Sequence, residues 1–125
     1  MNNFKECPYC HESWLTVDDF LIDKYVEIIG YQADFDKLED GIFFFNHRKP
    51  NCGTTLALEV YNFRGLHSGK VYSERKTNSE ECPLFCFDQK QLERCSVQCE
   101  CAFVREILQV IKDRKGVLYE IKMCR

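Results

Sequence analysis

The sequence predicts an α+β domain in which a small antiparallel sheet of three or four strands packs against a C-terminal helix. Three observations support this fold class. Residues 25–35 and 42–46 are strand-like runs, joined by a polar connection that ends in an Asp-Gly turn. Residues 54–60 alternate between apolar and other side chains, as a third strand would. Residues 97–114 place apolar side chains at helical spacing.

Length and composition indicate one globular domain. A chain of 125 residues is long enough for one hydrophobic core. The apolar fraction of 45% and the charged fraction of 30% are ordinary for a soluble domain. Ten Phe and six Tyr make the apolar content unusually aromatic, which favours a packed interior over disorder. We therefore expect residues 1–125 to form a single cysteine-rich domain.

Charge and hydropathy argue against some partners. The formal net charge is −3, and affinity for nucleic-acid phosphates needs a basic surface, so we do not expect a nucleic-acid partner. No apolar run approaches the roughly 20 residues of a membrane-spanning helix, so we expect no membrane partner. The chain does not open with the basic and apolar regions of an export signal, and we expect a cytoplasmic protein.

The first half of the chain predicts short elements. Thr16 is followed three residues later by an acidic side chain, which is a capping signal for a short helix over residues 17–22. Residues 42–46 return as the second strand of an antiparallel hairpin with 25–35. Residues 62–76 hold two Gly and mixed charge, and we expect a loop with at most one helical turn.

Residues 97–114 form the clearest predicted helix. Its apolar stripe, at i, i+4, i+7, i+11 and i+14, consists of Val97, Cys101, Val104, Leu108 and Ile111. The charged side chains placed off this stripe are Arg105, Lys112 and Asp113. Gly116 is expected to end the helix, because glycine is common just beyond a helix C-terminus. Residues 117–122 alternate and predict a last strand.

Nine cysteines are the most informative feature of the composition. In a reducing compartment, cysteines are more often metal ligands or redox groups than members of structural disulfides. Nine is an odd number, so at least one thiol stands outside any set of pairs.

Two short segments have the residues of a metal site. The C-P-Y-C segment at 7–10 points two thiolates at one ion, and the N–H groups of such a turn can donate to the sulfurs. The K-P-N-C-G segment at 49–53 has the same form, with Lys where the first Cys would stand. His47, two residues earlier, is the natural replacement. The set suits structural zinc in a closed tetrahedral Cys₃His site and consists of Cys7, Cys10, His47 and Cys52.

With these two turns, the first half of the chain resembles zinc-ribbon and rubredoxin-like domains. In those domains two such knuckles sit on a small antiparallel sheet, so the resemblance implies a bound metal beside a β-hairpin. The chain departs from that pattern at Lys49. If His47 does not supply the fourth ligand, His11 is the alternative.

The cysteines at 7 and 10 allow other interpretations. The pair matches the dithiol of glutaredoxins, but that motif follows a complete first strand, and only six residues precede Cys7. With His11 it matches the C-x-x-C-H motif of haem attachment, which requires export. The plain structural alternative is that Cys7 and Cys10 are free thiols and that His47 only caps a strand.

A second cluster follows in the C-terminal half, and its four spaced thiols are Cys82, Cys86, Cys95 and Cys99. They form two C-x₃-C pairs, and four thiolates can surround one ion if the connector between the pairs turns back. A Cys₄ zinc site is therefore the first hypothesis. An iron–sulfur cluster, a disulfide or dithiol switch, and plain buried thiols are the alternatives. Cys101 lies on the apolar stripe, where we expect a small buried hydrophobe.

The function that these patterns favour is a non-catalytic, zinc-stabilised module that binds another protein or a small ligand. One zinc is expected, at the first site, and the C-terminal cluster offers a place for a second. The alternatives are a thiol redox-responsive or iron–sulfur protein and a nucleic-acid-binding zinc ribbon. An enzyme with a catalytic zinc comes last, because a saturated Cys₃His site leaves no open position for water. Among the thiols, Cys124 is expected to react first with a labelling reagent.

Overall fold

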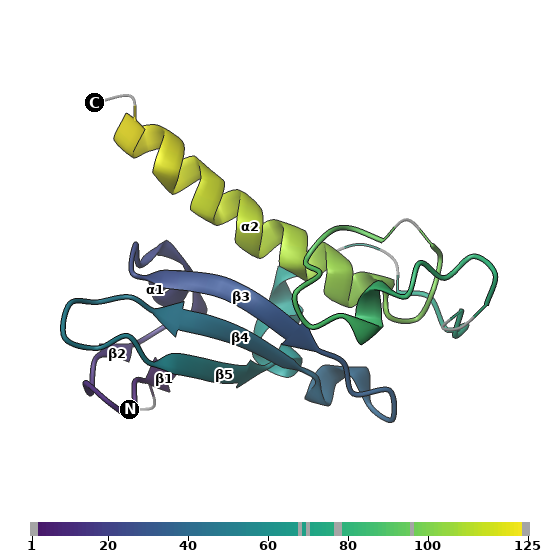
Figure 1. The fold of residues 1–125 in the computed structure, drawn as a ribbon, viewed down its shortest axis with the longest axis horizontal. Helices are drawn as coiled ribbons and strands as arrows, with labels where there is room; N and C mark the ends of the chain where they lie inside the picture. Colours follow the sequence, from purple (N-terminus) through teal and green to yellow (C-terminus); the bar gives the residue numbers. More distant parts are fainter. Residues whose placement is uncertain (1–2, 68, 70, 77–78, 96, 124–125) are drawn as a thin grey trace.

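The computed structural model describes residues 3–67, 69, 71–76, 79–95 and 97–123, with side chains through residue 114. The long helix α2 (Ala102–Met123) runs alongside a three-stranded sheet (Figure 1). A two-stranded sheet of β1 (Lys5–Glu6) and β2 (Ser13–Trp14) lies near one end of the larger sheet. The predicted α+β class, with a small antiparallel sheet and a C-terminal helix, is confirmed.

The larger sheet has the strand order β3-β4-β5, and its strands are Val26–Gln32, Ile42–His47 and Thr55–Glu59. Both strand pairs are antiparallel, and each strand falls within the segment predicted for it, except that β4 extends by one residue. Side chains alternate along β4, so that Phe43, Phe45 and His47 are buried. His47 is therefore the last inward-facing residue of a strand, which places its ring at the end of the core.

The core is largely aromatic. Phe20 meets the rings of Trp14 and Phe45 edge to face, at centroid distances of 5.0 and 4.9 Å. Phe63, from the 3₁₀ segment Val60–Leu66, packs on Phe43 at 5.5 Å. Each such pair adds about 0.5–1.5 kcal/mol beyond the area that it buries. The core thus connects the short N-terminal elements to the sheet.

The short helix α1 (Val17–Ile22) has the predicted bounds. The Thr16 hydroxyl accepts a hydrogen bond from the Asp19 N–H at 3.1 Å, as the capping signal predicted. At the other end, Asp23 accepts a 2.9 Å hydrogen bond from the Trp14 indole N–H. These bonds fix the chain on both sides of α1.

The C-terminal helix differs from the prediction at both ends. It begins at Ala102 rather than at residue 97, because tertiary contacts hold the residues before it, including a 2.8 Å bond from the Glu100 N–H to the Glu74 carbonyl. It continues through Gly116 to Met123, so the predicted stop and the predicted strand over 117–122 are wrong. One glycine costs a helix only about 1 kcal/mol. A short alternating run also does not separate strand from helix.

Arg105 lies off the apolar stripe, as predicted, but it is not exposed. Its side chain is fully buried. The guanidinium lies 5.5 Å from the ring centre of Tyr31 and 5.7 Å from that of Phe85. The apolar stripe itself is confirmed on the helix, where Val104, Leu108 and Ile111 are fully buried. The periodicity of apolar residues identified the face of α2 that packs on the core. It did not identify the second buried face, which holds Arg105 and is covered by a loop.

That loop spans residues 67–101 and is irregular in its described parts, apart from the 3₁₀ turn Phe85–Phe87. It attaches to β3, where the Tyr31 N–H donates to the Gln89 carbonyl at 2.8 Å. Gly30 permits this approach, since a Cβ there would lie 3.1 Å from the same oxygen. In Figure 1 the loop gathers at the N-terminal end of α2, away from the β1–β2 hairpin. Among the described residues, no helix is long and apolar enough to cross a membrane.

Candidate metal centre

The first cysteine turn joins β1 to β2 and contains Cys7 and Cys10. The Cys7 N–H donates to the Glu12 carbonyl at 2.7 Å, and the His11 N–H donates to the Cys7 carbonyl at 2.9 Å. His11 adopts a left-handed φ of 65° directly after Cys10. This geometry folds the turn back, so that both sulfurs face the same side.

The second turn joins β4 to β5 and follows the same plan. The Cys52 N–H donates to the Lys49 carbonyl at 2.9 Å, and the Gly53 N–H donates to the His47 carbonyl at 2.9 Å. Gly53 has a φ of 81°, in the region that glycine adopts without steric cost. A left-handed residue thus follows the last cysteine of each turn, His11 in one and Gly53 in the other.

The two turns bring four donor atoms together, from Cys7, Cys10, His47 and Cys52. All four atoms lie within 4.8 Å of one another, an arrangement that could hold a metal ion. The Cys7 and Cys52 sulfurs are 3.7 Å apart. The His47 Nδ1 lies 3.4 Å from the Cys52 sulfur and 3.6 Å from the Cys10 sulfur. Tetrahedral zinc–ligand bond lengths imply about 3.8 Å between two sulfurs and about 3.5 Å between sulfur and nitrogen.

His47 is positioned by its strand and by Trp14. Its ring is fully buried and meets the Trp14 ring edge to face at 5.1 Å. Nδ1 faces the sulfurs, whereas Nε2 is buried without a hydrogen-bond partner among the described residues. A metal on Nδ1 would place the ring proton on Nε2. The alternative ligand His11 lies elsewhere, since its ring is largely exposed and faces the Glu6 carboxylate at 3.5 Å.

Lys49 occupies the place of the missing cysteine, and its side chain pairs with a residue of the first turn. Its ammonium group donates to the Glu12 carboxylate at 2.8 Å, which joins the second turn to the first. The hydrogen bond to Glu12 raises the pKa of Lys49. Both side chains are about 40% exposed, so the pair contributes little to stability. No sequence pattern indicated this contact, because it joins two turns that only the fold brings together.

The pKa values of Cys7 and Cys10 are shifted in opposite directions. Burial tends to raise the pKa of Cys7, but the N–H groups of Cys10 and Tyr9 and the His47 ring outweigh it and lower the pKa to about 6. At Cys10 the Glu12 N–H tends to lower the pKa, but burial and the neighbouring thiols Cys7 and Cys52 raise it. The thiolate form of Cys7 is thus favoured, whereas a second thiolate at Cys10 is disfavoured. A cation removes that opposition, because it draws protons off its ligands.

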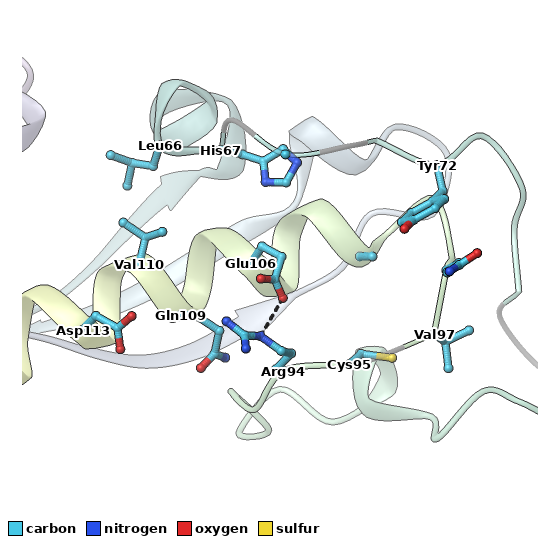
Figure 2. A pocket seen from close by; sticks show the side chains of 13 residues that line it. Leu66, His67, Tyr72, Arg94, Cys95, Val97, Glu106, Gln109, Val110 and Asp113 are labelled. Atoms are coloured by element: carbon cyan, nitrogen blue, oxygen red, sulfur yellow. Dashed lines mark hydrogen bonds and ion pairs between the residues drawn. The ribbon is translucent and has the colours of Figure 1, made fainter.

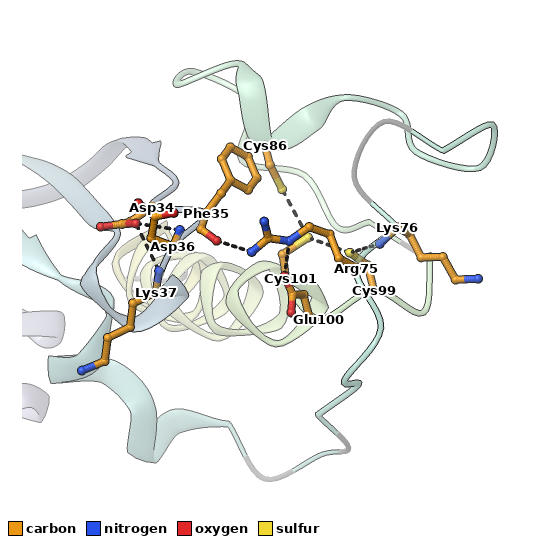
Figure 3. Close-up of polar contacts among 10 residues, drawn as sticks. All are labelled: Asp34, Phe35, Asp36, Lys37, Arg75, Lys76, Cys86, Cys99, Glu100 and Cys101. Atoms are coloured by element: carbon orange, nitrogen blue, oxygen red, sulfur yellow. Dashed lines mark hydrogen bonds and ion pairs between the residues drawn. The ribbon is translucent and has the colours of Figure 1, made fainter.

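The second cluster lies at the other end of β3, beside Tyr31. The Cys101 sulfur is 3.5 Å from that of Cys86 and 3.4 Å from that of Cys99. Cys101 is buried, as predicted for a small hydrophobe, but it also links two of the four spaced thiols (Figure 3). Cys82 and Cys95 line the same small cavity. Cys124 lies outside the described residues.

The buried charge beside this cluster is the feature that sequence reasoning missed. The Arg105 Nη1 donates to the Gln91 carbonyl, while Nε and Nη2 are buried without a hydrogen-bond partner among the described residues. The contact with Cys101 and the positive charge of Arg105 together lower the pKa of Cys86 to about 6, against the effect of burial. The sequence pattern did not indicate that Arg105 is buried, because helical periodicity shows only that this residue lies off the main apolar stripe.

A groove of about 480 Å³ lies between α2 and the loop, with Cys95 at its edge (Figure 2). Several of its polar groups are already engaged. Arg94 pairs with Glu106 at 2.8 Å, and the Gln109 amide donates to the Leu92 carbonyl at 3.0 Å. The groove therefore gives less reason to expect a specific ligand than either cysteine cluster does.

Comparison with known proteins returned no match to this chain among family models, curated proteins or solved structures. The function is therefore inferred from the geometry of the two clusters.

Proposed function

We propose that this chain is a non-catalytic module stabilised by one structural zinc ion in its N-terminal half. The ligands would be Cys7, Cys10, His47 and Cys52. The observation that carries the proposal is the mutual approach of these four donor atoms within 4.8 Å. Cys7 and Cys52 are 45 positions apart in the sequence, so neither turn could form such a set alone.

Zinc is the metal that best suits these donors. Three thiolates and one imidazole in tetrahedral geometry are typical of structural zinc, whereas calcium and magnesium prefer oxygen ligands. Cys7 and His47 are fully buried, so an ion here would be largely shielded from solvent. Binding energy at such a site is largely folding energy, because the site is assembled only in the folded chain.

Four protein ligands also support a binding role rather than catalysis. A catalytic zinc keeps one position open for water or substrate, and a closed Cys₃His set fills all four. We therefore propose that the module binds another protein or a small ligand, with the zinc holding the β1–β2 hairpin against the sheet.

Metal analysis of the purified protein tests this proposal. We expect zinc in the parent protein and loss of one zinc per chain in Cys10→Ser, by elemental analysis and native mass spectrometry. Cobalt substitution should give the intense visible bands of tetrahedral thiolate coordination. The matched control is His11→Ala, which changes the neighbouring exposed residue. A folded Cys10→Ser protein with unchanged metal content would contradict the proposal.

A further inference from the structure

The loop over residues 67–101 has little regular secondary structure of its own. Its described parts contain one 3₁₀ turn and otherwise no regular structure. Structureless loops of this length are uncommon inside compact domains. The loop nevertheless packs over α2 and covers a buried arginine. An additional cross-link would explain how it stays in place.

Five thiols of this region surround one small cavity. They come from the loop and from the residue just before α2, and they are Cys82, Cys86, Cys95, Cys99 and Cys101. The cavity has a volume of about 10 Å³, close to the space that one water molecule occupies. Cys101 is in direct contact with Cys86 and Cys99, at 3.5 and 3.4 Å.

Backbone N–H groups point at these sulfurs, as they do in the first site. The Leu84 N–H lies 3.4 Å from the Cys82 sulfur, and the Lys76 N–H lies 3.1 Å from the Cys99 sulfur. Leu84 holds a left-handed φ of 64°, a conformation that bulky residues rarely adopt. The chain's three prolines follow Cys7, Lys49 and Cys82, so the turn at Cys82 begins as the two turns of the first site do.

Two buried polar groups beside the cluster lack partners among the described residues. They are the Arg105 guanidinium, through Nε and Nη2, and the Tyr31 hydroxyl. Arg105 is fully buried and Tyr31 is 1% exposed. A buried charge is strongly destabilising unless a counter-charge lies beside it. The surroundings of Arg105 therefore favour negative charge, and the thiolates of the cluster are the groups at hand to supply it.

We propose that Cys82, Cys86, Cys99 and Cys101 bind a second metal ion, zinc, as a tetrathiolate whose negative charge is balanced by Arg105. Four thiolates around one Zn²⁺ leave a net charge of about −2 on the centre, and each thiol that still carries its proton releases it on binding. A disulfide that includes Cys86 would remove that thiolate from beside Arg105 and would supply no negative charge in its place. Cys95 lies on the edge shared with the neighbouring groove (Figure 2) and is the spare thiol.

Counting ions in single-site variants tests the second site separately from the first. We expect two zinc ions in the parent by native mass spectrometry, one in Cys101→Ser and one in Cys10→Ser. Cys95→Ser is the matched control and should keep two. One ion in the parent, with no change in Cys101→Ser, would overturn this site and leave the first intact. A parent that lacks two hydrogens, with one ion bound, would show a disulfide instead and would also overturn it.

Thiol labelling of the parent covers the case in which Cys101→Ser fails to fold. Cys82, Cys86, Cys99 and Cys101 should label slowly until a strong chelator is added, whereas Cys95 should label without it. Fast, chelator-independent labelling of these four would exclude metal coordination.

The role of Arg105 is tested by measuring the metal affinity of the second site in two variants. Arg105→Met should weaken metal binding at the second site about 10–100-fold, as loss of a supporting group around a metal does. Arg105→Lys keeps the charge and should restore part of that loss. Equal effects of Met and Lys would show that the arginine acts through packing, and the charge argument would fail.

Discussion

Two single residues, His47 and Lys49, determine which side chains can bind a metal at the first site. The turn places a lysine where its first cysteine would stand, and the end of β4 supplies an imidazole from the buried face instead. Lys49 is thereby free to pair with Glu12.

We predict that His47→Ala loosens the metal and that adding Lys49→Cys to this variant restores it. The physical reason is that the lysine already occupies a turn whose geometry suits a cysteine ligand, as shown by the Cys52 N–H bond to its carbonyl. Zinc affinity measured by competition with a chromogenic chelator checks this. Lys49→Ala alone is the control and should change zinc affinity little, because the ion pair with Glu12 is half-exposed.

Metal affinity at the first site should fall as the pH is lowered. The pKa of Cys7 is lowered to about 6 and that of Cys10 is raised, so above pH 6 Cys7 is already a thiolate and Cys10 must release its proton on binding. Below about pH 6 Cys7 must release a proton as well, and the dependence becomes steeper. The same competition assay, repeated from pH about 8 to about 5, measures this slope. An affinity independent of pH over that range would show that the thiols are not the ligands.

Helix α2 is the element that unites the two halves of the molecule. One face packs on the core through Ile107, Leu108 and Ile111, which are fully buried. Another face holds Arg105 under the irregular loop. The helix thus packs against both the sheet and the loop.

We predict that Leu108→Ala lowers the free energy of unfolding by about 2–5 kcal/mol, because the side chain is fully buried and leaves a cavity. Urea denaturation followed by circular dichroism is the measurement. Asp113→Ala is the matched control on the same helix, and its exposed side chain should change stability by less than about 0.5 kcal/mol. A change of that small size for Leu108→Ala would mean that the face is not packed.

At the scale of the whole molecule, the two cysteine clusters lie at opposite ends of β3. His47 pairs with Val26 at the start of the strand, and the loop joins near its end at Tyr31. Each end of the sheet therefore holds a segment with little regular structure of its own. The two clusters should respond to metal removal independently.

The single tryptophan allows that independence to be measured. Trp14 contacts His47 at 5.1 Å and belongs to the first site's end of the sheet. We expect tryptophan fluorescence to change when a chelator removes the first metal and in Cys10→Ser. Cys101→Ser should leave the emission of the metal-loaded protein as in the parent. Equal changes in both variants would show that the two ends unfold together.

The sequence by itself determined the features that depend on local pattern. The cap at Thr16, the alternation of β4 and the apolar stripe at Val104, Leu108 and Ile111 follow from side-chain periodicity. The grouping of Cys7, Cys10, His47 and Cys52 also followed from sequence, because turn residues mark where the chain reverses.

Only the tertiary structure decided the features that depend on distant segments. It brought Cys101 into contact with Cys86 and Cys99, buried Arg105 and placed Lys49 on Glu12. It also moved the start of α2 to Ala102 and carried the helix past Gly116. In each case the outcome depends either on contacts between segments far apart in the chain or on the stabilisation added up over all the residues of a long helix. Such terms outweigh local propensities of about 1 kcal/mol.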